Sequence, residues 1–190
     1  MSENVVMAVY NTSSDSANTA VRALLTKVGE FYLGSSFNTA SGNGKKLWLK
    51  IKEQDFASRC AYCEEASQTL QIEHLFMFNR TEFGLHHPGN VVPCCKSCNK
   101  RARNLDKTFC NWEQHLKEVC DKHGQKDQYE DRRQRILNHI EQYKYPKLNE
   151  SEKHAIRVIA NSLYENIKIE SEKSLELYKE LDQAFIKKPM

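Results

Sequence analysis

The sequence predicts an α+β protein that is mostly helical, with one small β-hairpin unit between N-terminal and C-terminal helices. Apolar residues recur at helical spacing over most of the chain, whereas between Cys60 and Cys98 the period changes to that of short strands. Two Cys-x-x-Cys pairs flank this central segment, a pattern typical of a zinc-stapled finger. We therefore expect three regions, over residues 1–57, 58–107 and 108–190.

The N-terminal region is expected to contain two helices. Residues 17–33 carry apolar side chains at helical spacing, and Asp15 and Ser16 are available as caps before them. Residues 34–44 are rich in Gly, Ser and Asn and show no period, which is typical of a loop. A shorter helix is then expected before Cys60.

The central region is expected to fold as a β-hairpin followed by a helix. Residues 69–78 and 90–95 have the character of two short strands, and the turn-rich segment between them contains His86 and His87. We expect these two histidines to face solvent or phosphate at the hairpin tip. Helical character resumes over residues 96–105.

Four apolar stripes predict four helices in the C-terminal region, and we interpret the stripes as core. The first two helices should end near Gly124 and before Pro146, and the third begins with a plausible capping box of Asn149 and Glu152. The fourth stripe comprises Leu177, Leu181 and Phe185.

Composition favours a cytoplasmic protein without membrane partners. The chain of 190 residues has no apolar run of membrane-spanning length, and its N-terminus lacks the pattern of a secretory signal. The net charge of +3 is too small for the total to indicate nucleic-acid binding. Seven cysteines without an export signal suit metal thiolates in a reducing compartment better than disulfides.

The paired cysteines supply the four thiolates of a structural zinc site. The predicted ligands are Cys60, Cys63, Cys95 and Cys98. The alternative is that these are unrelated buried cysteines, which two matched pairs make less probable. The three remaining cysteines, Cys94, Cys110 and Cys120, are interpreted as core thiols.

A carboxylate and an imidazole, Glu73 and His74, stand side by side in the apolar centre of the first predicted strand. Burying either group without a partner costs several kcal/mol in order of magnitude, so the pair needs hydrogen bonds, a metal or a cleft. With Asn90 and Asn99, these residues form the pattern "CAYC…IEH…N…CKSCNK", which resembles the HNH endonuclease family over roughly residues 58–104.

The resemblance implies a ββα metal finger and a role for each residue. His74 resembles the general base that takes a proton from water, and Glu73 and Asn99 resemble the oxygen ligands of a catalytic Mg²⁺ or Mn²⁺. Asn90 resembles the residue that pins the hairpin loop and orients the histidine. The family more often has Asp in place of Glu73 and often His in place of Asn99, which leaves the ligand geometry open.

Basic residues after the second cysteine pair fit a phosphate backbone, and the alternative is a solvated helix face. The candidate nucleic-acid-binding residues are Lys100, Arg101 and Arg103. The resemblance implies DNA as substrate, and no residue excludes RNA. Restriction, phage biology and antiviral defence are the settings we expect for such a nuclease.

Two further expectations concern rival functions and assembly. A non-catalytic zinc-dependent nucleic-acid-binding or adaptor module would explain the cysteines and the basic patch, but not the register of Glu73, His74, Asn90 and Asn99. One predicted active site per chain, with one general base and one ion, cuts one strand. We therefore expect a homodimer for double-strand cleavage, paired through the apolar stripes of residues 126–187.

Overall fold

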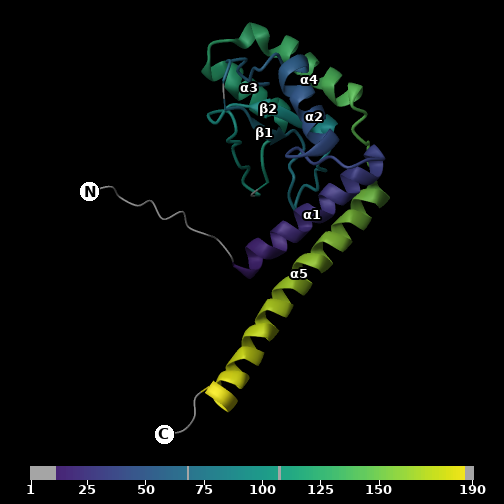
Figure 1. The fold of residues 1–190 in the computed structure, drawn as a ribbon. Coiled ribbons are helices and arrows are strands. Elements are labelled where there is room, and N and C mark those ends of the chain that lie inside the picture. Colours follow the sequence, from purple (N-terminus) through teal and green to yellow (C-terminus); the bar gives the residue numbers. More distant parts are fainter. Residues whose placement is uncertain (1–11, 68, 107, 187–190) are drawn as a thin grey trace, which may run out of the picture.

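A computed structural model describes residues 12–67, 69–106 and 108–186. Two long antiparallel helices, α1 and α5, lie side by side, and the remaining elements form a compact body beside α1 (Figure 1). The helices are α1 (Ser13–Leu33), α2 (Gly42–Lys50), α3 (Trp112–Lys122), α4 (Tyr129–Gln142) and α5 (Glu150–Leu181). Short helical turns are η1 (Ile51–Asp55), η2 (Pro88–Asn90), η3 (Lys126–Gln128) and η4 (Asp182–Ile186). Among these described helices, none has the length and apolarity needed to cross a membrane.

Helix α1 begins earlier than predicted. Thr12 is the N-cap, and it forms a capping box with Asp15, which lies in the first turn instead of preceding the helix. The helix ends at Gly34, whose φ of 71° is the left-handed conformation that glycine adopts without strain.

The capping box of Asn149 and Glu152 is confirmed at the start of α5. The separate fourth helix was a wrong prediction, because α5 continues through Leu177 and Leu181 as one helix of 32 residues. No Gly or Pro interrupts residues 150–181, so nothing in the sequence ends the helix there.

The sheet consists of β1 (Gln71–His74) and β2 (Val91–Cys94), which pair antiparallel with Glu73 opposite Val92. Both strands are shorter than predicted. Beyond β1, the backbone of Phe76 pairs with the Asn90 side chain instead of with a partner strand.

The helix predicted over residues 96–105 is absent, so the hairpin is not followed directly by a helix. A turn closes on Cys95, and side chains such as Asp106 and Asn104 then bond to nearby groups of the following loop. Such local bonds compete with helix formation. Helix α3 starts only at Trp112.

Two core clusters hold the fold together. The first surrounds the sheet and cysteines and contains Trp48 and Leu116, so the finger shares its core with both flanking regions. The second lies between α1, α5 and the hairpin loop. Helix α1 approaches this loop so closely that a Cβ on Gly29 would lie 2.3 Å from the His86 carbonyl oxygen. The loop is therefore held between sheet and helix.

Candidate metal centre and histidine site

The four predicted zinc ligands converge at one buried point. The sulfur atoms of Cys60, Cys63, Cys95 and Cys98 all lie within 4.8 Å of one another. The Cys63 and Cys95 sulfurs are 3.7 Å apart. Four thiolates around tetrahedral zinc, at Zn–S distances of about 2.3 Å, would be separated by about 3.8 Å. The cluster therefore fits a metal ion such as zinc.

Backbone hydrogen bonds shape both cysteine turns. In the first turn, Glu64 N donates to Cys60 O, and Ala61 N donates to Pro93 O of β2. In the second, Cys98 N and Asn99 N both donate to Cys95 O. The cluster thus joins the turn before β1 to the turn after β2, and not to a helix start as expected.

The electrostatics of the cluster favour a cation. Hydrogen bonds with Cys63, Cys94 and Cys98 hold the pKa of Cys60 below its usual range. The hydrogen bond with Cys60 in turn raises the pKa of Cys63 to about 12. Without a positive ion, one thiolate therefore suppresses ionisation of its neighbour. A divalent cation removes this conflict by neutralising several thiolates together.

Glu73 is bound to Arg101 and not positioned as a free metal ligand. Arg101 Nε lies 2.7 Å from Glu73 Oε1, and the two side chains are 2% and 9% exposed. The guanidinium also donates to the carbonyls of His74 and Leu75, each at 2.8 Å, and to the Tyr62 hydroxyl. Arg101 was expected to bind nucleic acid, but its charge is buried under β1.

The expected Mg²⁺ or Mn²⁺ site does not fit these side chains as they stand. A guanidinium already occupies the Glu73 carboxylate, and Asn99 Nδ2 donates to Gln71 Oε1 at 3.0 Å. Adjacent residues of a strand point to opposite faces, so Glu73 and His74 diverge. In the described ranges, neither residue belongs to a cluster of three His, Cys, Asp or Glu ligands.

His74 meets a second histidine on the other face of β1. His74 Nε2 lies 3.0 Å from His86 Nδ1, and its ring stacks on Phe78 with centroids 4.7 Å apart. His86 in turn packs against Phe37, at a ring distance of 5.0 Å. His87 is buried and accepts a hydrogen bond from Gly89 N. The expectation that the histidines face solvent or phosphate was therefore wrong for His87, whereas His86 is half-buried.

Asn90 ties the hairpin loop together from a fully buried position. Its Oδ1 accepts from Phe76 N at 2.7 Å, and its Nδ2 donates to the carbonyls of Phe76 and Leu85. Its own carbonyl accepts from Leu75 N. These bonds fix the chain directly after His74 and directly before His86.

The protonation of the histidine pair is set by burial. Burial lowers the pKa of His74 to about 3, with a further contribution from the nearby charges of His86 and Arg101. The pKa of His86 is lowered by burial and raised in part by the backbone of Phe37. Both rings are therefore neutral near pH 7, the form that can accept a proton.

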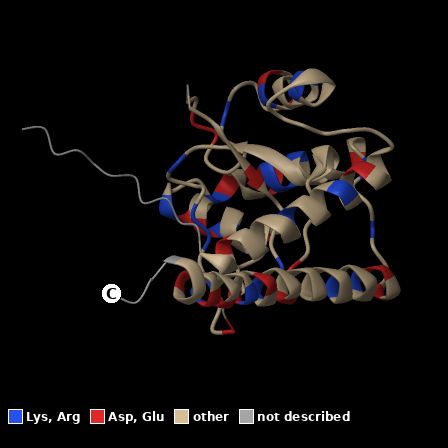
Figure 2. Ribbon diagram, turned by 60° about the horizontal axis from the view of Figure 1, so that its bottom comes forward, with Lys and Arg blue, Asp and Glu red and all other residues tan. Residues whose placement is uncertain are grey.

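Three arginines meet in a cleft beside the histidines. The cleft, of about 490 Å³, is lined by Arg22, Arg80 and Arg103, which come from α1 and two loops, and by one carboxylate, Asp15. Phe78 lines the same cleft and stacks on His74. Elsewhere Lys and Arg alternate with Asp and Glu along the elements, as on α5 (Figure 2). The cleft is thus a local basic feature, whereas Lys100 lines a different hollow.

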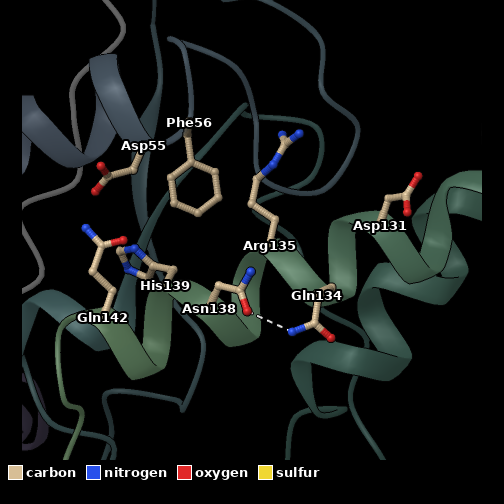
Figure 3. Close-up of a pocket in the computed structure, with 8 residues that line it drawn as sticks. All are labelled: Asp55, Phe56, Asp131, Gln134, Arg135, Asn138, His139 and Gln142. Carbon is tan, nitrogen blue, oxygen red and sulfur yellow. Dashed lines mark hydrogen bonds between the residues drawn. The ribbon is translucent and has the colours of Figure 1, made fainter.

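Another hollow, of about 360 Å³, lies between η1 and α4 and contains none of the predicted site residues (Figure 3). There Asp55 and Phe56 lie opposite side chains of α4. His139 Nε2 is 3.0 Å from the carbonyls of Pro88 and Val91. This histidine therefore joins α4 to the start of β2.

His86 and the arginine cleft were missed at the sequence level. The sequence contained a signal for His86, since two histidines in the turn-rich segment after the predicted base His74 are candidates for polar contacts with it. Arg22 carried no signal, because it joins the site only when α1 packs against the hairpin loop that carries Arg80. Comparison of the chain with protein-family models, curated proteins and solved structures found no match.

Proposed function

We propose that this chain is a zinc-stabilised endonuclease of the HNH type that hydrolyses phosphodiester bonds in DNA, with His74 as general base. The observation that carries the proposal is the His74–His86 hydrogen bond, held in place by the loop that Asn90 pins. A neutral, oriented imidazole stacked on Phe78, which lines the arginine cleft, supports a role as general base in phosphodiester hydrolysis.

The contacts favour one tautomer of the histidine pair. The Phe37 backbone beside the His86 ring favours a proton on His86 Nε2, which leaves its Nδ1 to accept from His74 Nε2. His74 Nδ1 is then the free acceptor, and no described residue bonds to it. It would take a proton from water as the water oxygen attacks phosphorus. The P–O bond to the leaving sugar oxygen breaks, and that oxygen takes up a proton from solvent. The nearby negative charge of phosphate would raise the pKa of the ring.

The basic cleft supports a nucleic-acid substrate. Arg103 and Arg80 lie on the loops nearest Phe78, and Arg22 faces them from α1. Guanidinium groups bind phosphate in a bidentate manner, so three of them fit a chain of phosphates better than a single small anion. We assign no step to Mg²⁺ or Mn²⁺, because Arg101 occupies the Glu73 carboxylate.

The zinc-dependent binding or adaptor module is the second candidate. The Glu73–Arg101 pair favours it, because a carboxylate neutralised by a buried guanidinium needs no catalytic ion to explain its place in the strand. The module explains the cysteine cluster and the cleft, but it gives His74 and His86 no task beyond packing.

A cleavage assay separates the two candidates. Supercoiled plasmid, linear DNA and RNA are incubated with the protein in Mg²⁺, Mn²⁺ or chelator, and zinc content is measured on the same preparation. His74→Ala should lower cleavage by about 10² to 10⁴ while zinc content and melting stay near wild type. His154→Ala, an exposed histidine of α5, is the matched control. A folded, zinc-replete His74→Ala that cuts at the wild-type rate would leave the binding module as the better proposal.

We also propose that double-strand cleavage uses two copies of the chain. Helix α5 extends past the start of α1 (Figure 1), and this end of the chain exposes Tyr178 and Leu181 of α5 and Phe185 of η4, at a spacing of three and four residues. This stripe continues the face with which Ile156, Ala160 and Tyr164 pack in the second core. Sedimentation should show a dimer that Leu181→Glu dissociates. A monomer that cuts both strands with first-order dependence on enzyme would contradict the proposal.

A further inference from the structure

A second cluster of metal-ligand side chains lies at the start of α3, outside the four-cysteine centre. Cys110 precedes the N-cap Asn111, and His115 and Glu118 follow on one helix face at i and i+3. One ligand atom from each of Cys110, His115 and Glu118 lies within 4.8 Å of the other two. The capping box of Asn111 and Gln114 fixes the helix start, and with it the position of Cys110.

His115 has the hydrogen bonding of a metal ligand. The residue is only 4% exposed, and its Nε2 lies 2.7 Å from the carbonyl oxygen of Cys98. Among the residues that the structure describes, its Nδ1 is buried without a hydrogen-bond partner. A histidine that binds a metal through one nitrogen usually donates the other N–H to a carbonyl or carboxylate. The Cys98 carbonyl provides that acceptor and leaves Nδ1 to the cluster.

A buried unpaired nitrogen costs free energy unless a ligand satisfies it. His139 also has an unpaired Nδ1, but within the described chain it belongs to no cluster of cysteine and carboxylate ligands. Among the described histidines, the combination of an unpaired imidazole nitrogen with a thiol and a carboxylate is therefore particular to His115.

We propose that Cys110, His115 and Glu118 bind a second zinc ion, with water at the fourth position. A thiolate, an imidazole and a carboxylate are the ligand types that zinc takes, and three protein ligands leave one position open. Cys110 was interpreted from the sequence as a core thiol, and this proposal gives it a different role. Tetrahedral ligands would be separated by about 3.5 Å, and the three ligand atoms already lie within 4.8 Å of one another, so the side chains would close by at most about 1.3 Å.

The surroundings supply a route for the ion. A cleft of about 270 Å³ is lined by His115 and Glu118, and Glu118 is exposed to solvent. Lys100 and Lys122 line the same cleft, so an anion in place of water at the open position would meet positive charge. The site does not depend on the nuclease proposal, because none of its residues contacts His74 or His86 in the described structure.

Zinc counting on the full-length chain tests the site. Protein purified with excess zinc is passed over a desalting column, and bound zinc is measured by elemental analysis. Wild type should hold two zinc ions per chain, and Cys110→Ala should hold one. Cys120→Ala, which removes a buried thiol of the same helix outside both clusters, should hold two. The second zinc of Glu118→Gln should bind at least about tenfold more weakly in competition with a chromogenic chelator.

Each outcome decides the proposal. One zinc in the wild type, two in Cys110→Ala, or an unchanged second affinity in Glu118→Gln overturns it. If Cys110→Ala fails to fold, the exposed Glu118→Gln variant decides alone, since circular dichroism and the first zinc report whether it is folded. Two zincs in Cys120→Ala, together with one in Cys110→Ala, excludes non-specific binding to any free thiol.

Discussion

Substitution of Glu73 should unfold the protein at a lower temperature, which is not the behaviour of a free metal ligand. Glu73→Gln removes the negative charge beside Arg101, whose side chain is only 2% exposed. Leaving one partner of a buried ion pair charged and uncompensated costs about 3–5 kcal/mol. The glutamine oxygen still accepts a hydrogen bond, so the lower end of this range applies. For a chain of this size, about 1 kcal/mol shifts the melting temperature by about 2–4 °C.

The expected loss for Glu73→Gln is therefore about 6–12 °C, measured by thermal circular dichroism on zinc-replete protein. The double variant Glu73→Gln with Arg101→Met removes both charges and should recover part of the loss, because no buried charge remains unpaired. A Glu73→Gln variant that melts within about 1 °C of wild type would refute the reasoning. It would mean that Glu73 is solvated and available to an ion.

Three other predictions follow from the same contacts. Cys60→Ala should lose zinc and solubility together, because the binding energy of a closed site is folding energy of about 10 kcal/mol; a soluble variant that keeps its zinc would contradict the four-cysteine assignment. Stability should fall as pH drops from about 6.5 to 4, because burial lowers the pKa of His74 to about 3 and that of His87 to about 4, so the unfolded chain takes up protons first. Urea unfolding at several pH values measures this slope, which His74→Gln should flatten, and stability that rises on acidification would disprove it. Gly29→Ala should lower the melting temperature, because a Cβ at 2.3 Å from the His86 carbonyl oxygen forces a backbone shift, and the upper part of the range of about 1–3 kcal/mol for overpacking exceeds the gain of about 1 kcal/mol in helix propensity. An unchanged melting curve would mean that the hairpin loop does not pack on α1 this closely.

Features that depend on local spacing could be predicted from the sequence. The cysteine turns and the capping box at Asn149 each follow from residues a few positions apart, and the fold contains both. The fourth apolar stripe was wrongly interpreted as core, because Leu177, Leu181 and Phe185 are 56%, 45% and 74% exposed. The helix over residues 96–105 was predicted wrongly because Arg101 bonds to strand carbonyls, a long-range contact that outweighs local helix propensity.

The contacts of Glu73 could not be predicted from local sequence patterns. Strand alternation places Glu73 and His74 on opposite faces of β1. The role of each residue then depends on which side chain it contacts on its own face. On one face Arg101, from the loop after β2, contacts Glu73. On the other face His86, from the hairpin loop, contacts His74. Neither the Glu73–Arg101 contact nor the His74–His86 contact corresponds to a residue spacing that a sequence motif specifies.

The geometry of the His74–His86 pair depends on α1, and through α1 on distant parts of the chain. His86 is held from one side by the loop that Asn90 pins, and from the other by Phe37, which follows α1. Gly29 lets α1 approach the His86 backbone, and α5 packs along the same helix. A finger cut out at residues 58–107 would keep its four cysteines but lose the support that orients His86 against His74. Zinc binding and histidine geometry therefore rest on different parts of the sequence, and variants should be able to remove one without the other.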